Sequence, residues 1–315
     1  MRHWYFLSFF LVSTVVFSQQ SFSKEFSLLT DNDLYTSISR DRYYSNGLFL
    51  TYNFLHKHTK NKNIAKKIST IQLGHMIYTP VKATLEFAAQ HDRPFAAFFF
   101  GEYGKSNFYK NQNILTTKLQ VGVIGPSAKG KGLQNFIHSI YNYPKAMGWK
   151  EQIKEAFVMN IELNYNKYFS KISSSQIDFS SYSKLRAGTI FTDFSTGIYS
   201  RIGFHKLQKL YNSTAFHSNL NTKENKSYSE SYIYLKPMVS YVMYDATIQG
   251  SFLNKSSPVT YDVMPFQFSL EIGYRYNWNR FNYGYTFHYH TKKLKSYRVE
   301  NSNSYGSIYI GYYFN

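Results

Sequence analysis

The fold class is decided by residues 266–290, which read FQFSLEIGYRYNWNRFNYGYTFHYH. From Phe266 to Trp278 every second residue is apolar or aromatic, and the residues between them are polar or glycine. This alternation is typical of a β-strand with one apolar face. After Asn279 and Arg280 the same pattern resumes, so the stretch predicts two antiparallel strands joined by a tight turn.

Similar segments recur along the chain, and residues 307–315 (SIYIGYYFN) repeat the pattern with an aromatic residue, Phe314, next to the end. An even number of strands lets an antiparallel barrel close with both termini on one side. We therefore predict an all-β fold, a twelve-stranded antiparallel transmembrane β-barrel with a short helix in an extracellular loop. The predicted strands lie near residues 25–33, 45–56, 66–78, 94–107, 113–125, 154–168, 178–188, 192–205, 230–246, 264–278, 280–292 and 303–314.

A secreted β-sandwich also alternates, and the pattern alone does not say which way the apolar face points. Composition favours the barrel, because 31 Tyr and 28 Phe among 315 residues match the aromatic girdles of outer-membrane barrels. The absence of cysteine excludes a disulfide-stapled domain, thiol chemistry and thiolate-bound metals. The formal net charge of +18 indicates a polyanionic partner, and export favours phosphorylated lipopolysaccharide over nucleic acid.

The N-terminus has the pattern of a signal peptide. A basic start precedes the apolar run Trp4–Phe17, which is shorter than the ~20 residues that a spanning helix needs. We predict a signal peptide at residues 1–23 and a barrel at residues 24–315, with cleavage after Ser23 or nearer Ser18. An uncleaved anchor is the less favoured alternative.

Loop parity predicts where the chemistry lies. With both termini in the periplasm, the end of the first strand and the start of the second lie at the extracellular rim. Asn32 and Asp33 end the first of these strands, and Ser45 begins the second. Taken one at a time, such residues are more often turn formers or solvated loop residues.

The loop after the fifth strand, about residues 126–153, reaches the same rim and contains a short helical pattern. Gln134 and His138 lie four residues apart and so share one face of that helix. One connection fits this scheme badly: residues 206–228 follow the eighth strand but are long and polar for a periplasmic turn. Either the strand count is wrong there or the chain carries an insertion.

In the order TDNDLY, DRYYSNGLFLTY, IYTP, HDRPFAAFFF, GVIGP, LQNFIH and GW, these segments together resemble the outer-membrane lipid A 3'-O-deacylase family over the whole mature length. The resemblance implies a twelve-stranded barrel with its active site between the outer wall and a helix of an extracellular loop. It also implies hydrolysis of the ester that carries the 3'-linked acyloxyacyl group of lipid A, with a divalent cation, usually Ca²⁺.

Residue by residue, the resemblance assigns the essential Asn-Asp pair, which would also bind the metal, to Asn32 and Asp33. It assigns the remaining catalytic positions to Ser45, Gln134 and His138. His138 would act as the general base that activates water; a Ser45 nucleophile is the alternative.

Two positions depart from the family pattern. Leu34 replaces a carboxylate that some members have, and Lys82 or Arg93 could replace basic residues that other members use.

The expected partners are lipid A or lipopolysaccharide and the outer-membrane bilayer, with no nucleic acid, and we expect a monomer. The predicted location is the bacterial outer membrane, with the active site facing the extracellular leaflet. Two other functions remain open at this stage: another outer-membrane lipid esterase or phospholipase, and a non-catalytic porin or adhesin.

Overall fold

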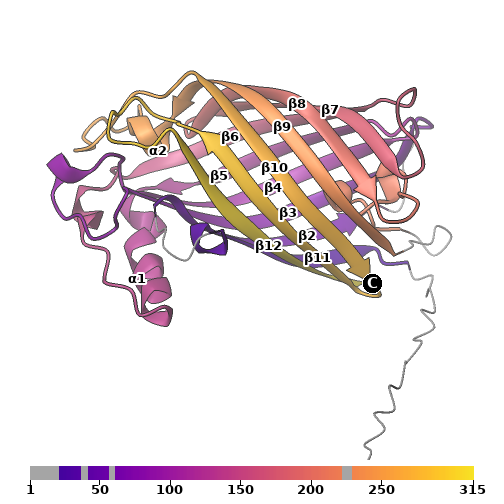
Figure 1. Ribbon diagram of the computed structural model, residues 1–315, viewed down its shortest axis with the longest axis horizontal. Helices are drawn as coiled ribbons and strands as arrows, with labels where there is room; N and C mark the ends of the chain where they lie inside the picture. The colour runs from indigo at the N-terminus through magenta and orange to yellow at the C-terminus, as the bar shows by residue number, and fades with distance from the viewer. Residues whose placement is uncertain (1–20, 37–41, 57–60, 222–228) are drawn as a thin grey trace, which may run out of the picture.

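The structure, a computed structural model, describes residues 21–36, 42–56, 61–221 and 229–315. Of the signal peptide predicted at residues 1–23, residues 1–20 lie outside the described part of the chain. The chain forms one closed antiparallel barrel in which each strand pairs with its neighbours in sequence and β1 pairs with β12 (Figure 1). The strands are β1 (Lys24–Asn32), β2 (Tyr43–Leu55), β3 (Ile64–Thr79), β4 (Ala96–Tyr109), β5 (Ile114–Ile124), β6 (Ala156–Tyr168), β7 (Ile177–Gly188), β8 (Phe191–Gly203), β9 (Glu230–Asp245), β10 (Phe266–Trp278), β11 (Phe281–Thr291) and β12 (Ser302–Phe314). The predicted count of twelve is confirmed.

The apolar residues of the alternating pattern face outward, and this excludes a sandwich. Phe268 and Tyr274 of β10 are exposed on the outer wall, whereas Glu271 and Arg275 line a cavity inside the barrel. An outward apolar band is the arrangement that a lipid-facing barrel requires. Among the described residues, no helix is long and apolar enough to cross a membrane.

The predicted hairpin is present, because Trp278 pairs with Phe281 across a two-residue turn. Asn279 adopts φ 54° there, a left-handed conformation that asparagine tolerates better than most residues. This turn lies at the same end as the C-terminus, since the backbone N–H of Tyr313 donates to the carbonyl of Arg280 at 2.7 Å.

The connection between β8 and β9, which we call the insertion, is long, and the strand count on either side of it was right. Its described part, residues 204–221, includes the short 3₁₀ helices η5 (Leu210–Asn212) and η6 (Ala215–His217) and packs into the barrel. The Lys66 ammonium donates to the carbonyl oxygens of Ser218 and Leu220 at 2.9 and 2.7 Å. The insertion therefore fills the lumen at the end that carries both described termini.

The opposite end carries the longer helix α1 (Gly130–Ile140), which lies outside the barrel (Figure 1). Loops and the short helix α2 (Ala246–Gln249) cover the lumen at this end. Four of their apolar side chains, Ile248, Val263, Leu294 and Val299, form one buried cluster with Tyr43 of β2 and Val242 of β9. The remaining 3₁₀ helices are η1 (Asp33–Tyr35), η2 (Ala88–Gln90), η3 (Pro126–Ala128) and η4 (Gly148–Glu151).

Candidate active site

Asn32 and Asp33 lie where β1 ends and η1 begins, and both side chains are buried. The Asn32 Oδ1 accepts a hydrogen bond from the Leu34 N–H at 2.8 Å and so caps η1, while Nδ2 donates to Asn46 Oδ1 at 2.8 Å. The Asp33 Oδ2 accepts from the backbone N–H of Arg42 at 2.6 Å. These bonds fix the pair against the start of β2.

Ser45 occupies a β-bulge. Tyr44 pairs with Tyr78 and Asn46 with Ile77, so Ser45 is the extra residue between two consecutive pairs of the β2–β3 ladder. A bulge redirects a side chain and is over-represented beside active sites. The Ser45 hydroxyl is completely buried and has no hydrogen-bond partner among the described residues, and leaving such a group unsatisfied costs about 1–3 kcal/mol. The hydroxyl is therefore available to a water molecule or a ligand.

Gln134 and His138 share the buried face of α1, as the four-residue spacing predicts. The Trp149 Nε1–H donates to Gln134 Oε1 at 2.7 Å. The His138 Nδ1 lies 2.5 Å from the carbonyl oxygen of Pro144. Because a carbonyl can only accept, Nδ1 carries the proton and the lone pair of the neutral ring is on Nε2.

A row of paired residues crosses four neighbouring strands and connects the Asn32 and Asp33 region with the region under helix α1. Asn32 pairs with Asn46, Asn46 with Ile77, and Ile77 with Ala97, on strands β1 to β4. With strands about 4.8 Å apart, the row from Asn32 to Ala97 spans roughly 14 Å. The row faces outward, because Phe99, two residues along β4 from Ala97, is exposed on the outer wall.

The start of α1 lies over the Ala97 end of this row. A Cβ atom at Gly130 would come within 2.5 Å of the Ala97 Cβ and 2.4 Å of the Trp149 ring, so only glycine allows this approach. Ile77, Ala97 and Trp149 belong to one buried apolar cluster. The structure thus joins Asn32 and Asp33 directly to β2, which carries Ser45, and it brings the helix with Gln134 and His138 to the same outer face through Ile77 and Ala97.

Sequence reasoning missed two residues of this region. Trp149 holds the Gln134 amide, and His75, on the outer face of β3, lies 2.6 Å through Nε2 from the carbonyl of Ala128. The signal for His75 was present, because an imidazole interrupts the otherwise apolar outward positions Leu73 and Ile77. Trp149 stands in the GW segment that contributed to the resemblance, but an irregular loop separates it from the helix, and no periodic pattern predicts its contact with Gln134.

The two basic residues considered for phosphate binding differ in accessibility. Lys82 is exposed. Arg93 is buried, donates to Thr247 Oγ1 at 2.8 Å and lies 4.2 Å from the centroid of the Tyr78 ring. Burial lowers the pKa of its guanidinium below the usual value. Of the two, only Lys82 can meet a lipid phosphate directly.

The described residues contain no group of three or more His, Asp or Glu side chains that could hold a metal ion. As far as the described residues go, a calcium site here would therefore rest on one carboxylate, Asp33, together with neutral oxygens. Calcium accepts six to eight oxygen ligands, including amide and backbone carbonyls and water. The Asn32 amide oxygen and the Ser45 hydroxyl are of this type, so the donor set is compatible with a hard cation.

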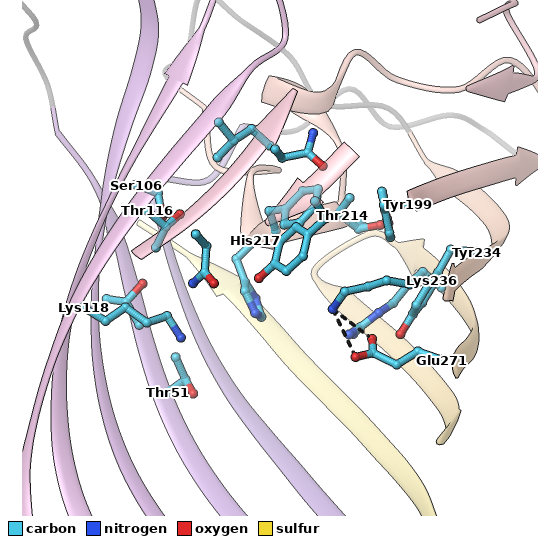
Figure 2. A pocket seen from close by; sticks show the side chains of 18 of the residues that line it. Thr51, Ser106, Thr116, Lys118, Tyr199, Thr214, His217, Tyr234, Lys236 and Glu271 are labelled. Atoms are coloured by element: carbon cyan, nitrogen blue, oxygen red, sulfur yellow. Dashed lines mark hydrogen bonds and ion pairs between the residues drawn. The ribbon is translucent and has the colours of Figure 1, made fainter. Parts of the chain in front are cut away.

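The cavities inside the barrel are separate from this region. One of about 270 Å³ is lined by inward-facing strand residues and by Thr214 and His217 of the insertion (Figure 2). Lys236 and Glu271 form an ion pair there, at 3.1 and 3.2 Å (Figure 2). The candidate active site lies on the other side of the barrel wall.

Comparisons with known proteins agree with this architecture. The model of the family described as "Outer membrane protein LpxR" matches residues 5–314. LpxR from Salmonella typhimurium is similar in structure, with a TM-score of 0.70 at 18% identity over 92% of this chain and 100% of that one. The β domain of the Bordetella autotransporter BrkA reaches a TM-score of 0.46 at 9% identity, over 94% of this chain and 100% of that one. No curated protein sequence matches the chain.

Proposed function

The chain belongs to the LpxR family of outer membrane proteins, and from this premise we propose that it is a lipid A 3'-O-deacylase. It hydrolyses the ester that links the acyloxyacyl group to the 3' position of lipid A. The observation that carries the proposal is the placement of His138 on a helix against the outer wall, with its Nδ1–H held by the Pro144 carbonyl. A lipid substrate reaches this face from the side, without leaving the bilayer.

In the proposed reaction, His138 Nε2 takes a proton from a water molecule as the water oxygen attacks the ester carbonyl. The tetrahedral intermediate then collapses, the bond from the carbonyl carbon to the 3' oxygen breaks, and the imidazolium gives its proton to that oxygen. The products are the free acyloxyacyl acid and lipid A with a 3' hydroxyl. The Pro144 carbonyl keeps the ring in the tautomer that this step needs.

Gln134 is suited to stabilise the developing oxyanion. Trp149 occupies its Oε1, and its Nε2 has no hydrogen-bond partner among the described residues. The amide therefore presents N–H donors, which is what an oxyanion requires. A bound calcium ion, held by Asp33 and Asn32, would supply further positive charge to that oxygen.

Direct attack by water is favoured over a Ser45 nucleophile. A nucleophilic hydroxyl needs a base within hydrogen-bond distance, and the Ser45 Oγ has no such partner among the described residues. We assign Ser45 to orienting the water or the substrate.

The lumen argues against the porin alternative. The insertion, which is held by hydrogen bonds from Lys66, fills the lumen at one end of the barrel. The apolar cluster that contains Ile248 covers the lumen at the other end. An open pore needs a continuous aqueous channel, and at both ends of this barrel described residues pack across the lumen. The outer wall is then the surface we assign to deacylation.

The test is mass spectrometry of lipid A and phospholipids from a heterologous Gram-negative host with and without the protein. We expect loss of the 3'-linked acyloxyacyl unit with the wild type and no loss with His138→Ala. Ser139→Ala, on the exposed side of α1, is the matched control and should act like the wild type. Unchanged lipid A with calcium present would refute the proposal, and release of fatty acids from phospholipids instead would identify a phospholipase.

A further inference from the structure

A second luminal cavity, of about 170 Å³, contains unpaired positive charge. Lys184 of β7 and Lys293, just after β11, both line it. Neither ammonium group has a hydrogen bond or ion pair with a described residue. The cavity lies near the end of the barrel that carries α1, because β11 runs from the turn at residues 279–280 toward that end.

The carboxylates of this cavity are already neutralised. Asp193 accepts from Arg186 Nη2 and Nε at 2.5 and 2.9 Å. Glu271 accepts from Lys236 in the neighbouring cavity. The two lysines are thus left without a counter-charge inside the cavity.

The surroundings of Lys293 do not change this result. Asp245 attracts its ammonium group, whereas Arg93, Arg186 and Lys184 repel it. Burial is the largest influence and, with the repulsion by the neighbouring cations, outweighs the attraction by Asp245 and lowers the pKa of Lys293 to about 8. Two uncompensated ammonium groups in one enclosed space are costly unless an anion lies between them.

His290 shows which anion fits. It is only 8% exposed, lines the same cavity, and has no hydrogen-bond partner at Nε2 among the described residues. Its Nδ1 lies 2.9 Å from the Thr291 carbonyl, so Nδ1 carries the proton and Nε2 is an acceptor. A ligand that satisfies both the lysines and His290 must accept hydrogen bonds from ammonium groups and donate one from a hydroxyl.

We propose that this cavity is a binding site for a hydrogen phosphate anion. Its unprotonated oxygens accept from Lys184 and Lys293, and its P–OH donates to His290 Nε2. Chloride and sulfate meet the lysines equally well but carry no proton for His290. This site is separate from the deacylase site, and the inference does not depend on the proposed activity.

The test uses the full-length protein folded in detergent, with binding measured by calorimetry at constant ionic strength. Inorganic phosphate should bind saturably and at least tenfold more tightly than sulfate. Lys184→Met and Lys293→Met should each weaken phosphate binding at least tenfold. Lys292→Met is the matched control, because the neighbouring lysine lines an outer-wall groove instead, and it should bind phosphate like the wild type.

Two further binding measurements test the role of His290 and distinguish free phosphate from a lipid phosphate. His290→Phe should remove the preference for phosphate over sulfate while retaining some anion binding. Dihexanoyl phosphatidic acid presents the same phosphomonoester on a lipid, and it should bind more weakly than inorganic phosphate, because the barrel wall separates the cavity from the bilayer.

The assignment is overturned if the wild type shows no saturable phosphate binding, if Lys293→Met binds as tightly as the wild type, or if sulfate equals phosphate. Binding of the lipid alone also overturns it. Heat-modifiable migration on gels reports barrel closure for each variant. The lysine variants should fold, because they remove uncompensated charge.

Discussion

The hydrogen bond between Trp149 and Gln134 gives the sharpest test of the proposed mechanism. Its 2.7 Å length and the burial of both side chains make it the interaction that orients the Gln134 amide. Trp149→Phe removes the donor but keeps an aromatic ring, leaving Gln134 Oε1 buried and unsatisfied, at a cost of about 1–3 kcal/mol. The amide then rotates to recover a partner and withdraws its N–H groups from the oxyanion.

Since about 1.4 kcal/mol corresponds to a factor of ten in rate, we expect kcat to fall about 10- to 100-fold. KM should change little, because the lost interaction acts on the transition state and not on the bound substrate. The assay is the initial rate of acyloxyacyl acid release from purified lipid A in mixed micelles, with circular dichroism to confirm the fold.

Phe95→Leu is the control for packing. The Phe95 ring centroid lies 5.1 Å from that of Trp149, so this variant disturbs the same cluster without removing the hydrogen bond. It should keep most of kcat, and the double variant Trp149→Phe/Gln134→Ala should be no slower than Gln134→Ala alone. Full activity of Trp149→Phe, or an equal loss in Phe95→Leu, would refute the positioning role.

Three other predictions follow from the contacts. In the wild type the Lys66 ammonium donates to three oxygen atoms of the insertion at 2.6 to 2.9 Å, and Lys66→Met leaves these acceptors without their cation. The temperature at which the barrel unfolds, read from heat-modified migration on gels, should fall by an amount equivalent to about 3 kcal/mol. An unchanged temperature would show that the insertion is held by other contacts. Asp33→Ala and calcium chelation should each abolish deacylation, and calcium should restore only the chelated wild type; activity of Asp33→Ala in calcium would remove Asp33 from the metal site. Phe22 stacks on Tyr313 with ring centroids 5.9 Å apart, so we expect the mature protein to retain Phe22, with signal cleavage nearer Ser18 than Ser23. Mass spectrometry of the mature protein measures this, and a mass that corresponds to a chain starting at Lys24 would contradict it.

The sequence predicted the strands well because alternation is a local property. Each strand found in the structure overlaps its predicted range, including the hairpin around Asn279. Parity then placed Asn32 and His138 at one end, because that argument needs only the order and number of strands. The short helix was also predictable, since the spacing of Gln134 and His138 fits a helical face.

The remaining features depend on contacts between distant parts of the chain. The bulge at Ser45 shifts the β2–β3 register by one residue, and the sequence of neither strand alone predicts this shift. The insertion folds into the lumen because Lys66, about 150 positions earlier, offers its ammonium group to the carbonyls of Ser218 and Leu220. Trp149 reaches Gln134 only through an irregular loop. These are the places where register and tertiary packing, and not local pattern, decide the structure.

The filled lumen and the outer-wall site are related physically. The row from Asn32 to Ala97 crosses four strands, so relative sliding or splaying of β1 to β4 would separate Asn32 and Asp33 from the helix that carries His138. The insertion bridges the lumen, because Lys66 of β3 binds it on one side and Arg201 of β8 and Glu230 of β9 bind its Ser213 on the other. A barrel bridged in this way resists such deformation. Catalytic groups placed on separate strands and a loop need this rigidity, because an error of 1 Å is costly to a general base. On this view the interior supports the geometry of the outer wall, and loosening the insertion should reduce the rate of deacylation before it unfolds the barrel.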